Sequence, residues 1–257
     1  MEFAYPLVGF IVGSVVGLTG VGGGALMTPL LVFGFGVVPL TAVGTDLMFA
    51  AITKSSGIAA HGLRDNIDWG LFRWLALGSI PASLLSIVGL SRLEGSGYRG
   101  DAFILPTLGV ALLLTAMAIL SRQRLRDWVL RSAPQFRVIP EALRTVVAGT
   151  VLGVLVTVTS VGAGALGVAA LMMLRPKMAA KRIVGTDIAH AVPLAGVAAF
   201  GHLRLGHIDW ILLASLLIGS IPGIWVGTVM GSRLPEAYMR HILVGVLLTV
   251  GLICLWP

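Results

Sequence analysis

Two aspartates lie inside apolar stretches of the chain, each at the end of the same four-residue sequence. Val-Gly-Thr-Asp occurs at 43–46 and returns, letter for letter, at 184–187. A carboxyl group in the hydrocarbon region of a membrane costs about 3 kcal/mol on insertion scales, so such residues usually face a cavity and have a function. We therefore predict that Asp46 and Asp187 take part in proton coupling or gating. The alternative is a first-turn aspartate whose carboxylate is satisfied by backbone N–H groups.

A lysine lies two helical turns beyond Asp46. Lys54 stands within Lys-Ser-Ser-Gly, and the second copy of the pattern has Ala195 at the matching position. A cation at this depth could supply a fixed positive charge for an anion. It could instead extend its ammonium to the membrane interface while its stem stays in the apolar region. The flanking serines indicate a polar helix face, so we predict that Lys54 belongs to a substrate site.

A histidine and two hydroxyls lie close to the aspartates along the chain. His190 follows Asp187 by three residues, so both side chains can share a helix face. We predict that it takes part in proton coupling or gating, by passing protons or by binding an anion when charged; the alternative is a structural hydrogen bond. Thr45 and Thr186 offer hydroxyls that can bind an anion without a charge, and we predict them to contact substrate.

Small residues interrupt an apolar segment near the start of each copy, at 20–24 and 160–164. The apolar piece after each interruption, 24–36 or 164–174, has about a dozen residues, and a helix of that length covers about 18 Å. The hydrocarbon core is about 30 Å thick, so we expect broken or re-entrant helices. Their N-termini would lie near mid-membrane and attract anions; the alternative is close helix packing by small residues. The predicted substrate-binding glycines are Gly22, Gly23, Gly24, Gly162 and Gly164.

The composition indicates that these segments lie in a membrane. The chain of 257 residues is 57% hydrophobic and 11% charged, whereas soluble domains carry roughly 25% charged residues. Several apolar runs approach or exceed the roughly 20 residues that span a bilayer. We expect an all-α polytopic protein of the plasma membrane, which in a bacterium is the inner membrane.

Further matches at the same offset show that the chain is one unit written twice. His61 matches His202, for which an interfacial or hinge role is expected, and Gly-Ser-Ile-Pro recurs. The first copy covers 1–121 and the second covers 142–257. The segment 122–141 is basic and contains two prolines, so we expect a loop with one surface helical turn.

Charge predicts how the copies are oriented. If each copy has a broken or re-entrant pair and three full spans, the second is inverted relative to the first. With the 122–144 linker in the cytoplasm and both termini outside, most of the 18 basic residues lie inside, as the positive-inside rule requires. Inverted repeats of this kind are common in transporters. The alternative treats residues 5–36 as one true crossing, which places the N-terminus inside.

Several other functions are disfavoured. The net charge of +7 arises from cations gathered in the connections between apolar segments, so no nucleic-acid partner is expected. The acids and histidines form no metal-binding pattern, and neither a metal nor a cofactor is expected. An intramembrane aspartyl protease would use two aspartates, but its Gly-x-Gly-Asp signature is absent because Thr45 separates Gly44 from Asp46. A passive anion channel remains open.

The chain resembles the TauE/SafE family of sulfite exporter-like permeases. The resemblance covers essentially the whole chain and is carried by Gly-Leu-Thr-Gly-Val-Gly-Gly-Gly at 17–24, the two Val-Gly-Thr-Asp sequences and the two Gly-Ser-Ile-Pro sequences. It implies a secondary transporter, not an enzyme, that exports sulfite, organosulfonates such as sulfoacetate or similar small anions, using protons as the coupling ion. The second tip departs from the first: Ser160 stands in place of Gly20, and Ala163 in place of Gly23.

Overall fold

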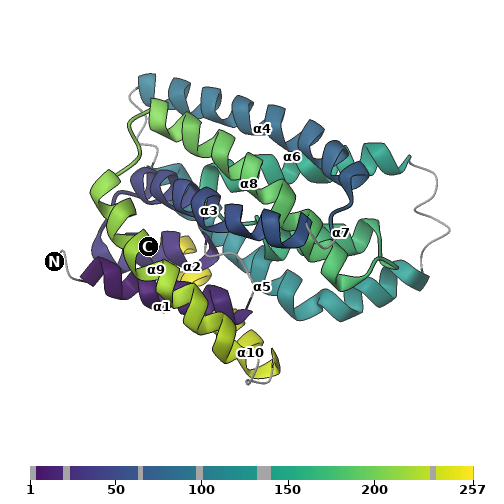
Figure 1. The fold of residues 1–257 in the computed structure, drawn as a ribbon. Helices are drawn as coiled ribbons and strands as arrows, with labels where there is room; N and C mark the ends of the chain where they lie inside the picture. Colours follow the sequence, from purple (N-terminus) through teal and green to yellow (C-terminus); the bar gives the residue numbers. More distant parts are fainter. Residues whose placement is uncertain are drawn as a thin grey trace.

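The computed structural model describes residues 4–19, 24–62, 66–96, 101–131, 140–231 and 236–256. All regular structure in these ranges is helical, which confirms the expected all-α class (Figure 1). In chain order the helices are α1 (Ala4–Thr19), α2 (Gly24–Pro29), η1 (Leu30–Gly34), α3 (Pro39–Gly62), α4 (Trp69–Gly95), α5 (Asp101–Arg131), α6 (Glu141–Thr159), α7 (Ala165–Leu174), α8 (Ala180–Arg204), α9 (Trp210–Gly231) and α10 (Glu236–Leu255).

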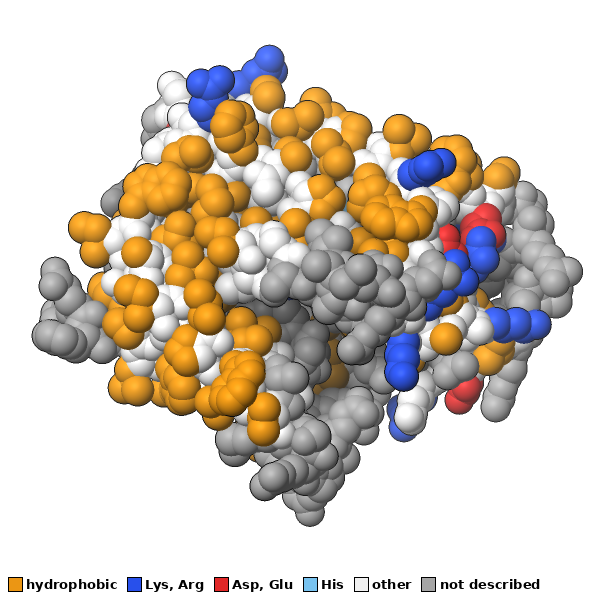
Figure 2. All heavy atoms as spheres, viewed as in Figure 1, with side chains coloured by type: hydrophobic (Ala, Val, Ile, Leu, Met, Phe, Trp, Pro, Cys, Tyr) orange, Lys and Arg blue, Asp and Glu red, His pale blue; other side chains and the backbone are white. Residues whose placement is uncertain are grey.

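In the described ranges, five stretches of helix are long and apolar enough to cross a membrane, within α4, α5, α6, α8 and α9. Large apolar side chains on their outer faces are exposed, among them Leu85, Ile211 and Ile218. Figure 2 shows this apolar surface across one face of the molecule, with lysines and arginines gathered toward its edges. A face of this kind is stable in lipid, so the polytopic membrane class is confirmed.

The helices of the two copies pack in a reciprocal pattern. The helix α1 packs along α9, and its counterpart α6 packs along α4, which is the counterpart of α9. The two remaining main pairs join counterparts directly, α3 with α8 and α5 with α10. The bundle is therefore held together largely by contacts between copies, and α3 and α8 lie side by side within it (Figure 1).

Matched glycines allow the two outer pairs to approach closely. A Cβ at Gly13 of α1 would overlap the carbonyl oxygen of Ser220 on α9, and a Cβ at Gly153 of α6 would overlap that of Ser79 on α4. These residues are counterparts in the duplication. Small residues are typical of helix interfaces in membranes, where van der Waals packing drives association.

We expect Gly153→Ala to destabilise the bundle by about 1–3 kcal/mol, the range found when a well-packed core is overfilled. The matched control is Gly89→Ala on α4, where an added Cβ meets no atom within 4 Å. That substitution should raise stability by about 0.5–1 kcal/mol, because alanine loses less backbone entropy in a helix. Unfolding in mixed micelles measures both, and equal effects of the two substitutions would contradict the assigned packing role.

The prediction of a loop over 122–141 was wrong for residues 122–131. The helix α5 continues through these residues and ends at Arg131. The segment contains no glycine or proline before Pro134, and its arginines, leucines and glutamine are good helix formers. The charge content signals the end of the apolar part of the span, but it does not stop the helix. Residues 132–139 of the linker lie outside the described part of the chain.

Short helices follow both interruptions, as expected. The first is α2 with the π-helical turn η1, covering 24–34, and the second is α7, with 10 residues. The break between α6 and α7 contains Ser160, Gly162 and Gly164, with φ of 58°, 120° and 140°. Such angles favour glycine, so this backbone leaves the helical path at the predicted tip. The first tip, at 20–23, lies outside the described residues.

Candidate functional site

Both aspartates lie inside long helices rather than at helix starts. Asp46 in α3 and Asp187 in α8 are 0% and 3% exposed, and neither helix has an acidic residue in its first turn. The first-turn alternative is therefore excluded. Because α3 packs against α8 and each also contacts the short helix of its own copy, both carboxyl groups lie in the interior of the bundle.

The Asp46 carboxyl group has one oxygen bonded and one oxygen free. The Thr28 hydroxyl on α2 donates a 2.6 Å hydrogen bond to Oδ2. The other oxygen, Oδ1, is buried and has no partner among the described residues. The hydroxyl of Ser160 lies beside this carboxyl group, but the two groups do not meet hydrogen-bond geometry, and the hydroxyl is buried with no other partner among the described residues. Unpaired buried polar atoms are rare in proteins, so this carboxyl oxygen and the Ser160 hydroxyl are candidates for binding a proton or a ligand.

The ammonium of Lys54 reaches from α3 to the break between α6 and α7. Its Nζ donates a 2.6 Å hydrogen bond to the carbonyl oxygen of Ala163. It also interacts electrostatically with Asp187 and Asp46. The side chain is partly buried, and its charged end is held by the break. Lys54 thus links the first copy to the tip of the second.

The Asp187 carboxyl group lies against the first turns of α7. Its Oδ1 is so close to Gly167 that any side chain at that position would overlap it. One turn further along α8, His190 Nε2 forms a 2.8 Å hydrogen bond with the Ser79 hydroxyl of α4. His190 is buried and interacts electrostatically with Lys54. The histidine therefore has the structural hydrogen bond considered from the sequence, at the edge of the charged cluster.

The two threonines of the repeated sequence join the copies. Thr45 Oγ1 accepts a 3.1 Å hydrogen bond from the backbone N–H of Asp209, and Thr186 Oγ1 accepts a 2.8 Å bond from that of Asp68. Each acceptor belongs to one copy and each donor to the other. The hydroxyls predicted to bind substrate are thus engaged in positioning α3 and α8 in this structure.

The partner aspartates are helix caps. Asp68 precedes α4 and accepts from Leu71 N, while Asp209 precedes α9 and accepts from Leu212 N. Both belong to an Ile-Asp-Trp sequence, in which an aspartate stands immediately before an apolar helix. That pattern is the usual signal for an N-cap, and it could have been used to place these two residues from the sequence.

Three of the glycines predicted to bind substrate lie within the described residues. Gly24 begins α2, whereas Gly22 and Gly23 lie outside the described residues. Gly162 and Gly164 form the break before α7, and Gly164 is its N-cap without a side-chain hydrogen bond. The break therefore brings the N-terminus of α7 into the same region as Ser160, and Ala163 O holds Lys54. Thr28 and Ser160 were not predicted, because a single hydroxyl beside small residues carries no distinct sequence signal.

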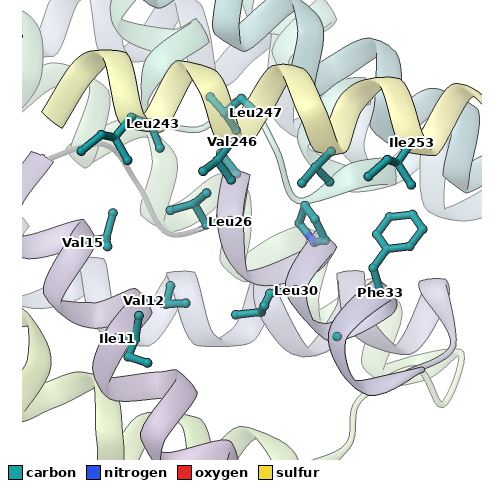
Figure 3. Close-up of a pocket in the computed structure, with 15 residues that line it drawn as sticks. Ile11, Val12, Val15, Leu26, Leu30, Phe33, Leu243, Val246, Leu247 and Ile253 are labelled. Atoms are coloured by element: carbon teal, nitrogen blue, oxygen red, sulfur yellow. The ribbon is translucent and has the colours of Figure 1, made fainter. Parts of the chain in front are cut away.

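A pocket beside the first short helix is lined by apolar side chains. It has a volume of about 310 Å³ between α1, α2 with η1, and α10. Figure 3 shows Val12, Leu26, Phe33 and Leu247 pointing into it from these helices. It offers no charged group, so it does not suit an anion. Among the described residues no group of three or more metal-ligating side chains is found.

A bundle of apolar helices with a partly buried lysine and two buried aspartates at a helix break is typical of a polytopic membrane transporter. The comparisons agree: the chain belongs to the sulfite exporter TauE/SafE family, whose sequence profile matches residues 5–253. It is 38% identical to the probable membrane transporter protein YjnA of Bacillus subtilis, over 98% of this chain and 99% of that protein. It is 26% identical to YdhB of the same organism, also a probable membrane transporter protein, over 91% and 92%. No solved structure matches the chain.

Proposed function

We propose that this protein is a secondary transporter that exports small sulfur-containing anions, sulfite or organosulfonates such as sulfoacetate, in a process coupled to the proton gradient. The observation that carries the proposal is the position of Lys54, whose ammonium binds Ala163 O at the α6–α7 break and interacts with both Asp46 and Asp187. The family description, sulfite exporter, supports the choice of a sulfur oxyanion.

The charges of this cluster link anion binding to proton binding. One ammonium facing two ionised carboxylates has a net charge of −1, which repels an anion. Two unit charges about 4 Å apart interact by about 4 kcal/mol at an effective dielectric constant of 20. Each proton taken up by Asp46 or Asp187 removes one such repulsion. Protons and anion therefore favour each other's binding, and the same coupling free energy acts in both directions. The two would move together, so that export carries protons outward and is driven by the anion's own gradient.

The anion would lie between the break and Lys54. Ser160 has a free hydroxyl there, and the N-terminus of α7 contributes N–H groups and partial positive charge. In this proposal Gly162 and Gly164 let the ligand approach the backbone. Gly22, Gly23 and Gly24 would contribute the equivalent tip from the first copy. Thr45 and Thr186 hold α3 and α8 in position, and His190 orients the α8 face that carries Asp187.

The proposed membrane topology would bring the two tips together at the site. The two copies are inverted relative to each other, with the 122–144 linker in the cytoplasm and both termini outside. The short helices then enter the membrane from opposite sides, so that their N-termini meet near its centre. The reciprocal packing of α1 with α9 and of α6 with α4 is compatible with this symmetry.

Flux measurements in proteoliposomes test the function. We expect labelled sulfite or sulfoacetate to move faster when a pH gradient is imposed, and anion movement to carry protons with it. Flux of the anion without any accompanying proton movement would identify a passive anion channel instead. No flux of any sulfur oxyanion under any gradient would contradict the proposal.

A further inference from the structure

Three ionisable side chains meet near the C-terminal end of α8. His207, in the connection that follows α8, pairs through Nε2 with Glu94 Oε1 on α4 at 2.9 Å. Its Nδ1 lies 3.3 Å from Nδ1 of His202 on α8. His202 is fully buried, and its Nε2 lies 2.9 Å from the carbonyl oxygen of Thr157 on α6. Asp187 and His202 are fifteen residues apart on α8, which is about 22 Å along the helix axis, so this triad is separate from the Lys54 cluster.

The geometry determines how many protons the two rings hold. The carbonyl oxygen of Thr157 can only accept, so His202 Nε2 must carry a proton. The Glu94 carboxylate likewise requires a proton on His207 Nε2. The contact between the two Nδ1 atoms is a hydrogen bond only if one of them, and not both, is protonated. If the contact is a hydrogen bond, the two rings together hold three protons, and the carboxylate of Glu94 favours the positive charge on His207.

The other charged groups near the triad, within the described part of the chain, have different partners. Arg204, in the last turn of α8, places its guanidinium over the Phe200 ring at 5.5 Å. Asp209, after His207 in the connection, accepts hydrogen bonds from Ile211 N and Leu212 N. The α3 and α6 helices face the histidines with backbone and neutral groups, at Gly44 and Thr157. Among the described residues, Glu94 is thus the counter-ion of the pair.

The same connection contacts the helix that carries Asp46. The carbonyl oxygen of His207 lies against Gly44, closely enough that a Cβ at Gly44 would overlap it. Two residues further on, Asp209 N donates to Thr45 Oγ1. The triad therefore fixes the 205–209 connection on α4 and α8, and the connection in turn supports α3 one residue from Asp46.

We propose that Glu94, His207 and His202 form a proton-binding site that holds one proton between the two rings and thereby latches the 205–209 connection onto α3. Removal of this proton leaves two lone pairs facing each other at Nδ1. Addition of a second proton at this contact places two Nδ1–H groups opposite each other. Either change breaks the ring-to-ring hydrogen bond, so the latch is closed in only one protonation state.

The sign of the pH dependence follows from proton counts. The folded pair holds three ring protons. In the unfolded chain the two rings hold four at low pH and two at high pH, changing near pH 6.5, where free histidine is half protonated. The unfolded state binds more protons than the folded state below this pH and fewer above it. The stabilisation by the triad is therefore greatest near pH 6.5 and decreases on both sides.

Melting temperatures of the full chain in detergent, without substrate, provide the first test. We expect Glu94→Gln and His207→Gln to lower the Tm by about 2–4 °C at pH 6.5. This is the change that the loss of one hydrogen-bonded contact produces in a protein of this length. The difference from the unmodified protein should shrink at pH 5 and pH 8. The matched control, His241→Gln, removes a histidine from α10 and should leave the shape of the pH profile unchanged.

Nitrogen-15 NMR of labelled histidine in bilayers provides the second test, which does not depend on how the variants fold. We expect a coupling through a hydrogen bond between two Nδ1 atoms, and its loss in His207→Gln but not in His241→Gln. Parallel pH profiles for all four proteins, or two neutral rings without Nδ1 coupling at pH 6.5, would overturn the proposal. Both measurements are made without an anion, so they are independent of the proposed transport function.

Discussion

Replacement of Lys54 by methionine is expected to reduce anion flux by about 100- to 1,000-fold. The substitution keeps the length of the side chain and removes the cation that binds Ala163 O and interacts with Asp46 and Asp187. Loss of about 4 kcal/mol of attraction corresponds to nearly three orders of magnitude at 1.4 kcal/mol per tenfold. Uptake of labelled sulfite into proteoliposomes measures the effect.

Two further variants make the interpretation specific. Lys54→Arg keeps the charge but replaces a compact ammonium with a planar group, and it should retain part of the flux. Arg73→Met removes an exposed cation from α4 and should behave like the unmodified protein. If Lys54→Met and Arg73→Met lower flux equally, overall positive charge is responsible, and the proposed site is wrong.

Asp46→Asn and Asp187→Asn are expected to uncouple anion binding from protons. Asparagine is neutral at every pH and resembles the protonated acid in shape. In the double variant, affinity for the anion at pH 8 should rise to the value that the unmodified protein reaches at pH 5.5, a change of about tenfold or more for each repulsion removed. Proton movement that accompanies anion flux should disappear. Binding by thermal stabilisation and flux with a pH-sensitive dye measure the two effects.

Asp209→Asn is the matched control for these substitutions. Asp209 is a helix cap outside the proposed site, and asparagine caps helices as well as aspartate does. Its pH dependence should be that of the unmodified protein. Unchanged pH dependence in the double variant would show that the coupling protons bind elsewhere.

The sequence alone predicted which segments are helical and that ionisable residues lie within the apolar ones. Long apolar runs and the duplication indicated a membrane bundle, and the small residues at 160–164 marked the break before α7. These features depend on local composition, which a single sequence contains. The sequence left the burial of Asp46 and Asp187 as one of two alternatives, because a first-turn aspartate also fits a carboxylate shortly after a loop. The helix starts at Pro39 and Ala180 decide between them.

Contacts between the copies could not be predicted in this way. The partner of Thr45 is Asp209, and the partner of Lys54 is a backbone carbonyl at Ala163. Neither residue type indicates its partner, because the pairing depends on how α3 lies against the second copy. The His202–His207–Glu94 triad was missed for the same reason: its members come from separate elements and share no motif.

The hydrogen bonds of Thr45 with Asp209 and of Thr186 with Asp68 have a consequence for the origin of the fold. Exchange of the two copies turns one bond into the other, as it does for the glycine contacts of α1 with α9 and of α6 with α4. Such a set of contacts is isologous, like the interface of a symmetric dimer. A half-length ancestor that carried one threonine and one aspartate could therefore have made both bonds by self-association, before a gene fusion joined its two subunits.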